Sequence, residues 1–271
     1  MPVEESQTAR WNGRAGTAWV ASRALTDDLL RPMENALVDA VTAAGARDVL
    51  DVGCGTGGTT VALARHARCV GLDLSEQMVA AARERAAEDG STATFLCADA
   101  QTHPFTPGEF DAIVSRFGVM FFPEPPVAFA NLHRAARPGA ALRCVVWRGG
   151  EENPFMLVPE QAAAPVVPGL ATSPPGSAGR FSFAGPAVVH RALDASWHDV
   201  DLVPLDLECR MPESALVGYF TNFGALAQVW TDLDEHTRAT AVSTVRAAFD
   251  PFVHGDEVRY TAACWMITAR A

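Results

Sequence analysis

The chain of 271 residues is acidic, and its 21 basic side chains are all arginines. With 32 acidic side chains, its formal net charge is −11. The absence of lysine from the sequence excludes Schiff-base enzymes of the pyridoxal-phosphate or aldolase kind, and it excludes a P-loop nucleotide site. Scattered arginines on an acidic chain also disfavour nucleic acid as a partner, because phosphate neutralisation supplies most of that affinity.

The composition predicts a globular protein of the cytoplasm. Hydrophobic residues make up 49% of the chain and charged residues 20%, a balance typical of a folded domain. The amino terminus is acidic and polar, unlike a targeting segment. No apolar run approaches the roughly 18 residues of a membrane span, so we expect no membrane partner. The six cysteines include no C-x-x-C pair, so we expect reduced thiols and no zinc cluster.

The predicted elements begin with a helical arm at 17–44, which we expect to break near Pro32 and to stop at Gly45. Five short apolar runs follow, separated by stretches of helical periodicity. We predict strands at 48–52, 68–73, 93–97, 110–115 and 140–147, and helices at about 58–66, 75–88 and 125–136. This alternation predicts a parallel sheet that is covered by helices on both faces.

The second half of the chain has a different character. Residues 151–185 are rich in Pro, Gly, Ala and Ser and predict a surface excursion with little periodicity. We then predict a helix at 186–196, a strand at 198–209, helices within 213–250 and a closing strand at 258–268. The fold class is therefore α/β, a Rossmann-like, mostly parallel sheet of seven strands with a helical cap. The expected divisions are an arm or lid at 1–44, a ligand-binding core at 45–150, a cap insertion at 151–185, a core continuation at 186–210, a helical cap insertion at 211–256 and a last core strand at 257–271.

The strongest functional signal is the glycine turn VLDVGCGTGG. Gly53, Gly55 and Gly57 follow a predicted strand and open a helix, where a tight turn and a closely approaching ligand require glycine. Gly53, Gly55 and Gly58 also satisfy the dinucleotide fingerprint G-x-G-x-x-G. Asp73 ends the next predicted strand, 20 residues after Gly53. A carboxylate at that place accepts hydrogen bonds from the ribose hydroxyls of an adenosine-containing cofactor.

Two acids and the position of the turn favour S-adenosylmethionine over NAD. Asp51 precedes Gly53 by two residues, where it could meet a cationic amino group but would repel a pyrophosphate. Asp99 ends the third predicted strand and suits an adenine amino group, with Ala100 as a backbone donor. The turn also begins only after about 45 residues, whereas dinucleotide domains often open with it. For Asp51 the alternative is a water molecule or a helix terminus.

Residues 47–149 resemble the class I S-adenosylmethionine-dependent methyltransferases, particularly the branch near the ubiquinone and menaquinone C-methyltransferases. The matching segments are LDVGCGTG, GLDLSEQM, ADA, FDAIVSRFGVMFF and LHRAARPGAAL. The resemblance continues through ENPF at 152–155, the helix and strand at 186–208 and the final CWMITA, but it is loose in the cap segments 156–183 and 211–255. These motifs specify the cofactor and say little about the methyl acceptor.

The resemblance implies a cofactor site, residue by residue. The glycines would line the methionine portion of the cofactor, Asp73 would hold the ribose, and Leu74 and Met78 would flank the adenine. Ser115 and Arg116 would approach the methionine end. The alternatives are a core position for Met78 and a surface charge at Arg116. The full implied set is Asp51, Gly53, Cys54, Gly55, Gly57, Asp73, Leu74, Met78, Asp99, Ala100, Ser115 and Arg116.

The acceptor site is expected beyond the carboxyl ends of the strands, under the cap. Methyl transfer needs alignment and exclusion of water, and it needs a base only where the acceptor must lose a proton. Aromatic side chains that could pack a flat or lipophilic acceptor, with cap core as the alternative for each, are Trp11, Trp19, Phe117, Phe121, Trp147, Tyr219 and Phe223. The base stays open, with His103, His190 and His254 as weak candidates.

These observations predict a cytoplasmic methyltransferase that acts on an oxygen, carbon or nitrogen atom of a small organic molecule, in specialised metabolism. Two alternatives stay open, a cyclase or rearrangement enzyme of the same fold and an NAD(P)-dependent oxidoreductase. The stretch PEPPV at 123–127 lacks the aromatic residue of nucleic-acid amino-methyltransferases. The segment SRFGVMFF supplies no acid for a catechol-type metal site.

Overall fold

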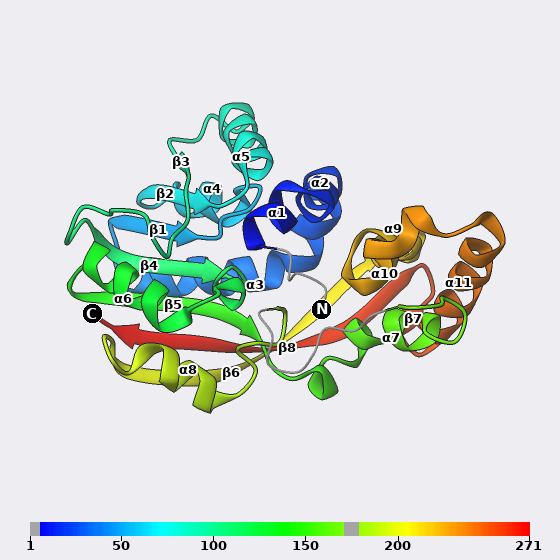
Figure 1. Ribbon diagram of the computed structural model, residues 1–271. Coiled ribbons are helices and arrows are strands. Elements are labelled where there is room, and N and C mark those ends of the chain that lie inside the picture. Colours follow the sequence, from blue (N-terminus) through cyan, green and yellow to red (C-terminus); the bar gives the residue numbers. More distant parts are fainter. Residues whose placement is uncertain (1–5, 171–178) are drawn as a thin grey trace.

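The computed structural model describes residues 6–170 and 179–271. In Figure 1 an α/β core and a smaller helical lobe are joined by two long strands. The helices are α1 (Gln7–Asn12), α2 (Arg14–Ala21), α3 (Arg23–Ala43), α4 (Gly58–Leu63), α5 (Glu76–Glu88), α6 (Pro125–Ala135), α7 (Pro154–Ala163), α8 (Pro186–Leu193), α9 (Leu216–Asn222), α10 (Gly224–Val229) and α11 (Glu235–Ala248). The strands are β1 (Asp48–Val52), β2 (Arg68–Asp73), β3 (Thr94–Cys97), β4 (Phe110–Arg116), β5 (Ala136–Trp147), β6 (His198–Pro212), β7 (Val253–His254) and β8 (Glu257–Arg270).

One sheet runs through the described part of the chain, in the order β3-β2-β1-β4-β5-β8-β6. The first five strands are parallel, and β8 lies antiparallel between β5 and β6. Helices α3, α4 and α5 pack against one another on one side, while α6 and α8 form the other pair. The predicted Rossmann-like, mostly parallel sheet is confirmed, and the two-residue β7 joins the seven expected strands.

The central strands are apolar because helices cover both faces of the sheet. The predicted bounds 48–52 and 68–73 match β1 and β2 to the residue. Val49, Leu50 and Val52 are at most 1% exposed. Because these strands run parallel, their carboxyl ends meet at one edge of the sheet, where ligands bind in folds of this kind.

Strands β6 and β8 extend past the core as a two-stranded ribbon (Figure 1). The pairing of β5 with β8 ends at Trp147, opposite Cys264, while the pairing of β6 with β8 continues to Pro212 and Glu257. We call residues 206–212 and 257–263, which lie beyond the end of β5, the distal ribbon. Met211 and Val258 of the distal ribbon join a second hydrophobic cluster with α7, α9, α10 and α11. The helical lobe is therefore built on the continuation of the core sheet.

The arm breaks at a different place from the one predicted. Helix α3 runs through Pro32 without ending, and the break falls at Ser22, between α2 and α3. A proline inside a helix costs about 3 kcal/mol. Burial of Met33 and Leu37, which are both fully buried in the core beside it, offsets that cost, because fully burying one such side chain contributes about 1.5–3 kcal/mol.

The segment predicted as a surface excursion contains a regular helix, α7, within 151–170. Pro154 stands at its first turn, where a missing N–H costs nothing, and Pro159 lies inside it. The helix packs on α11, which supplies the apolar partner that periodicity alone does not reveal. Residues 171–178 of the predicted excursion lie outside the described residues.

No described helix has both the length and the apolar character needed to cross a membrane.

Candidate functional site

The glycine turn between β1 and α4 touches the segment that follows β4. Gly53 has a φ of +68°, and a Cβ there would lie 2.7 Å from the Gly118 Cα. Ser115 holds the two segments together, because its Oγ donates to the Val52 carbonyl (2.7 Å) and accepts from the Gly118 and Val119 amides (3.1 and 3.2 Å). These bonds occupy the Ser115 hydroxyl, so this residue shapes the site through the backbone it holds.

The other glycines of the turn serve two purposes. One allows close packing of helices, and one leaves backbone that a ligand could approach. At Gly57 a Cβ would lie 2.9 Å from the Ala82 Cβ, so the absent side chain lets α4 and α5 pack closely. The Cys54 side chain points into the same small cluster as Ala82. At Gly55, which has a φ of +54°, only the Met78 Sδ lies within reach of a Cβ, at 3.8 Å. Gly55 is thus the glycine of the turn whose backbone a ligand could approach.

Asp73 is fastened at the end of β2 by backbone amides. Its Oδ2 accepts from the Gly55 N–H at 2.8 Å and its Oδ1 from the Ser75 N–H at 2.9 Å. Burial raises the pKa of Asp73, and the hydrogen bonds from Ser75 and Gly55 oppose that rise. A carboxylate has about four lone-pair positions, so two amide bonds leave Asp73 able to accept further hydroxyls.

Asp51 is buried near the turn, and the half-buried Arg116 lies close enough for its charge to act on it. The Asp51 side chain is 1% exposed and accepts from Thr60 Oγ1 at 2.6 Å. Burial raises the pKa of Asp51 to about 6, against the opposing effects of the Thr60 hydrogen bond and the Arg116 charge. Arg116 donates to the Leu30 carbonyl of α3 at 3.3 Å, and burial lowers its pKa. Arg116 therefore lies against the arm.

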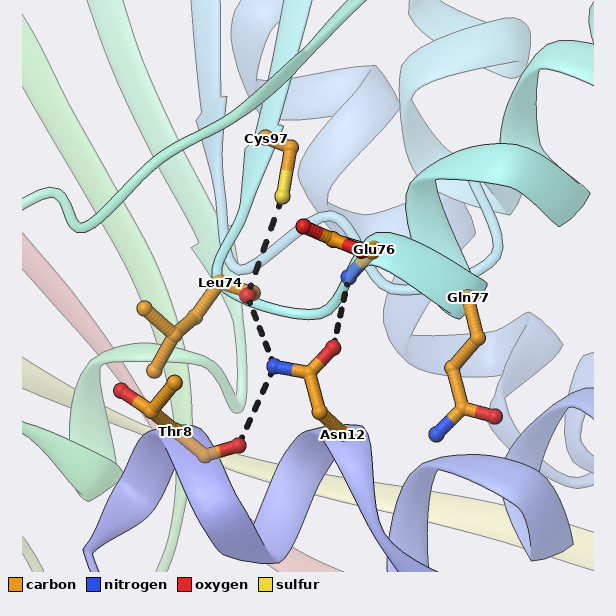
Figure 2. A pocket seen from close by; sticks show the side chains of 6 residues that line it. All are labelled: Thr8, Asn12, Leu74, Glu76, Gln77 and Cys97. Atoms are coloured by element: carbon orange, nitrogen blue, oxygen red, sulfur yellow. Dashed lines mark hydrogen bonds between the residues drawn. The ribbon is translucent and has the colours of Figure 1, made fainter.

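Hydrogen bonds join the arm to the turn that follows Asp73, and we call this connection the strap. Figure 2 shows Asn12 of α1 between Leu74 and Glu76, where it donates to the Leu74 carbonyl (3.3 Å) and accepts from the Glu76 N–H (2.9 Å). Ser75 Oγ also donates to the Trp11 carbonyl at 2.7 Å. The residue that binds the Asp73 carboxylate through its N–H therefore binds the arm through its hydroxyl.

An open pocket of about 700 Å³ adjoins this strap. Figure 2 shows its lining, which is Thr8, Asn12, Leu74, Glu76, Gln77 and Cys97. Asp99 stands just beyond Cys97 and is exposed, with one oxygen accepting from the Gln101 N–H at 2.8 Å. The next residue, Ala100, is fixed through its carbonyl by Asn131 at 2.9 Å. Of the residues predicted to contact an adenine, Leu74 and Asp99 thus lie at an accessible edge of the sheet, whereas Met78 and Ala100 are each 4% exposed.

The seven predicted aromatic residues fall into two rows of ring contacts. The first aromatic row runs Phe117, Trp147, Phe155 and Tyr260, with centroid separations of 4.3, 6.2 and 3.8 Å. The second aromatic row runs Phe121, Trp11, Trp19, Phe223 and Tyr219, with separations of 5.0, 6.4, 5.3 and 6.1 Å. Both rows begin just after β4, beside the glycine turn, and both end in the helical lobe.

Phe117 starts the first aromatic row in a strained conformation. Its φ is +66°, a left-handed value that costs a bulky residue about 1–3 kcal/mol. Its ring stacks on Trp147 with an interplanar angle of 6°, and its N–H donates to the Val145 carbonyl at 2.9 Å. Strain of this kind persists only where the surroundings impose it, as they do around functional sites.

The histidine candidates lie apart from these residues. His103 packs on Phe105 in the connection from β3 to β4, and His190 on α8 contacts Asp194 at 3.1 Å. His254 is exposed in β7, at the far end of the distal ribbon. None of the three belongs to either aromatic row or contacts the glycine turn. No group of three or more metal-ligating side chains occurs among the described residues.

Sequence reasoning missed several residues that the fold brings to the site. Asn12 and Gln77 fasten the arm, since Gln77 donates to the Trp11 and Gly13 carbonyls at 3.2 and 3.1 Å. Phe155 and Tyr260 complete the first aromatic row. The glycine after Phe117 was a usable signal for a close backbone approach. For Asn12 and Tyr260 no local pattern exists, because their partners are distant in the sequence.

Comparison with known proteins bears on this site directly. Residues 49–139 match the model of a methyltransferase domain. Nocamycin O-methyltransferase of Saccharothrix syringae is 30% identical over 234 residues, which cover 80% of this chain and 82% of that protein. An uncharacterised protein of Mycobacterium tuberculosis is 32% identical over 147 residues, so this chain spans about half (54%) of its length.

The fold is shared with a solved methyltransferase. Phosphoethanolamine N-methyltransferase 2 of Haemonchus contortus, solved with S-adenosyl-L-methionine, superposes with a TM-score of 0.59 at 15% identity. The match covers 99% of this chain and 60% of that one. With the family model, the relative matched over most of its length and the glycine turn joined to Asp73, the chain belongs to the class I S-adenosylmethionine-dependent methyltransferases, enzymes whose cofactor is S-adenosyl-L-methionine.

Proposed function

We propose that this enzyme methylates an oxygen, carbon or nitrogen atom of a small aromatic or lipophilic molecule, in the cytoplasm and in specialised metabolism. The observation that carries the proposal is that each aromatic row begins next to one part of the strand-end site. Gly118, which follows Phe117, abuts Gly53 of the glycine turn, and Trp11, which contacts Phe121, is bound through its carbonyl by Ser75 beside Asp73. The name of the Saccharothrix relative, nocamycin O-methyltransferase, favours oxygen among the three atoms. The six cysteines are all free thiols, which supports a reducing compartment.

The residues at the strand ends fit S-adenosylmethionine. Gly55 has space above its Cα for the methionine portion, and Asp73 keeps lone pairs for the ribose hydroxyls. The open pocket beside Leu74 and Cys97 suits the adenine. Asp51 and Arg116 contribute the charges nearest the methionine end, and Met78 packs beneath Gly55.

The chain's own groups would act by positioning. When bound, S-adenosylmethionine supplies a methyl group already activated on a sulfonium. Asp73 and the glycine turn hold the donor's adenosine and methionine portions, and the arm covers them through Asn12 and Ser75. Aromatic rings of the two rows exclude water from the acceptor and pack its apolar surface. Their faces also tolerate a nearby cation.

We further propose that different segments of the chain have different roles. Residues 1–44 act as a lid, while 45–150, 186–210 and 257–271 form the donor-binding core. The insertions 151–185 and 211–256 act as the cap over the acceptor. The contact of Trp19 in the arm with Phe223 in the lobe, at 5.3 Å, supports a joint between lid and cap.

The test is a pair of titrations followed by a product assay. Calorimetry with S-adenosylhomocysteine and with NAD should give binding of the former and none of the latter, and the reverse result contradicts the proposal. Incubation with S-adenosylmethionine and a panel of phenols, carboxylic acids and amines should then yield a product heavier by one methylene unit. A consumed substrate that returns an isomer of unchanged mass would favour a cyclase or rearrangement enzyme instead.

A further inference from the structure

Both aromatic rows end at the same place in the lobe. Tyr219 closes the second row, and Tyr260, the last ring of the first row, packs with it against the lobe cluster. Tyr219 also lies close enough for its charge to raise the pKa of Tyr260. These are the two tyrosines of the chain. The two rows thus run from the segment after β4, beside the proposed donor site, to the two tyrosine hydroxyls in the lobe.

A buried ion pair lies next to that end. Glu160 of α7 pairs with Arg180, and the two side chains are 11% and 29% exposed. Glu160 Oε1 also accepts from the Ala225 N–H at 3.3 Å. A Cβ at Gly224 would lie 3.3 Å from Glu160 Oε1 and 3.5 Å from Arg180 Nη2, so the pair sits directly behind the residue that follows Phe223.

The two members of the ion pair differ in how many hydrogen-bonding groups they keep available for a ligand. The Glu160 carboxylate is turned toward the protein and binds both Arg180 and the Ala225 amide. Arg180 uses one N–H on Glu160 and one on the Met156 carbonyl at 3.4 Å, out of the five that a guanidinium carries. No hydrogen bond joins the Tyr219 hydroxyl to another described residue. The Arg180 guanidinium, which is 29% exposed, therefore keeps hydrogen-bond donors beside the apolar side chains of the lobe cluster.

A purely structural role explains this arrangement less well. Removing two charges from water costs about as much as their attraction returns, and a buried pair is often replaced by apolar side chains without loss of stability. In the hydrophobic interior of the lobe an apolar contact would join α7 to α10 equally well. A guanidinium held in place by a carboxylate is, by contrast, an established way to bind an anion with defined geometry.

We propose that Arg180 and Tyr219 form an acceptor-recognition site for an anionic group, such as a carboxylate or an enolate, at the end of the acceptor remote from the methylated atom. This rests on the proposed function, because the aromatic rows define which end faces the methyl donor. Glu160 is a positioning residue that orients the guanidinium. The acceptor is accordingly an elongated apolar molecule with a nucleophilic atom at one end and an acidic group at the other.

Two fluorescent probes with the same rings test the charge requirement. Anilinonaphthalene sulfonate carries an anionic group, and phenylnaphthylamine is its neutral counterpart. Both are titrated into the full chain saturated with S-adenosylhomocysteine. We expect the wild type to bind the sulfonate more tightly, and Arg180→Gln to weaken the sulfonate about tenfold while changing the neutral probe less than about twofold. Arg191→Gln, at an exposed position of α8, is the matched control and should behave as the wild type.

The outcomes separate this proposal from the proposed function. Failure of the wild type to bind S-adenosylhomocysteine contradicts the methyltransferase function itself. With that binding intact, the recognition site is refuted by any of three results, namely no binding of the sulfonate, equal losses of both probes in Arg180→Gln, or no loss of either. If Arg180→Gln does not fold, Tyr219→Phe removes one oxygen and should weaken the sulfonate alone, by about threefold; an unchanged affinity refutes the proposal.

Discussion

At the scale of single residues, Asp73 connects two turns of the candidate site. It joins the glycine turn to the turn that holds the arm, through the amides of Gly55 and Ser75. We expect Asp73→Ala to weaken S-adenosylhomocysteine binding by about 1–3 kcal/mol, the scale of a lost charged hydrogen bond. Calorimetry measures the change, with Glu84→Ala, at an exposed position of α5, as the control. An affinity equal to that of the wild type would refute the ribose role.

Asp51 makes the fold sensitive to pH. Burial raises its pKa from an ordinary 3.8 to about 6, so the folded chain binds the proton more tightly than the unfolded chain does. Its contribution to stability is complete below about pH 4 and is lost as the pH rises to about 6. Asp51→Asn removes this loss, which approaches about 3 kcal/mol at neutral pH.

Urea unfolding of both proteins at about pH 4 and about pH 7 checks the Asp51 prediction. The variant should gain stability relative to the wild type at the higher pH alone. Asp73, whose pKa is also raised by burial, is present in both proteins, and its charge is a minor one of the causes that raise the pKa of Asp51. Two proteins that lose stability in parallel across this interval would mean that Asp51 is ionised in the fold at a much lower pH.

At the scale of elements, the arm is bound both to the proposed donor site and to the lobe. Its Asn12 and the Trp11 carbonyl bind Leu74 and Ser75, and its Arg14 reaches the Gln228 carbonyl at 3.0 Å. We expect deletion of residues 1–20 to speed the dissociation of S-adenosylhomocysteine about tenfold, the effect of about 1.4 kcal/mol. Stopped-flow fluorescence measures the rate. Helix content from circular dichroism should fall only by the arm itself, and an unchanged rate would exclude a lid.

The lobe depends on its own hydrophobic cluster. Phe249 is fully buried between α11 and the distal ribbon, and truncation of a buried phenylalanine costs about 3–5 kcal/mol. Phe249→Ala should therefore lower the free energy of unfolding by that amount, as measured in urea. Its affinity for S-adenosylhomocysteine should stay unchanged, because the cluster contacts none of the residues of the glycine turn. A loss of affinity without a loss of stability would contradict this division.

The elements that the sequence predicts best are those whose signals are local. Glycines, apolar runs and Asp73 define β1, α4 and β2 because each depends on neighbours a few residues away. Helix α7 and the continuity of α3 through Pro32 depend on partners far along the chain, which outweigh the local cost of proline. The pairing of Glu160 with Arg180 has the same origin, since residues 20 positions apart meet only after the lobe has folded.

At the scale of the whole molecule, strands β6 and β8 each contribute to both hydrophobic clusters. Cys264 and Ile267 of β8 pack in the core, and Val258 of the same strand packs in the lobe. We expect calorimetric unfolding to give a single transition, because the lobe cannot lose β8 while the core keeps it. Saturation to about 100 times the dissociation constant with S-adenosylhomocysteine should shift that transition as a whole, by about 2.7 kcal/mol. Two resolved transitions would show that core and lobe unfold independently.

The continuous ribbon also has an evolutionary consequence. The residues proposed to bind the methyl donor lie at the ends of β1, β2 and β4, whereas the far ends of both aromatic rows are carried by the distal ribbon and the helices that it supports. Inheritance can therefore alter the ribbon's outer half, its length or its helices while the donor half keeps its register. The acceptor specificity of a related protein could therefore change while its cofactor-binding residues stay the same.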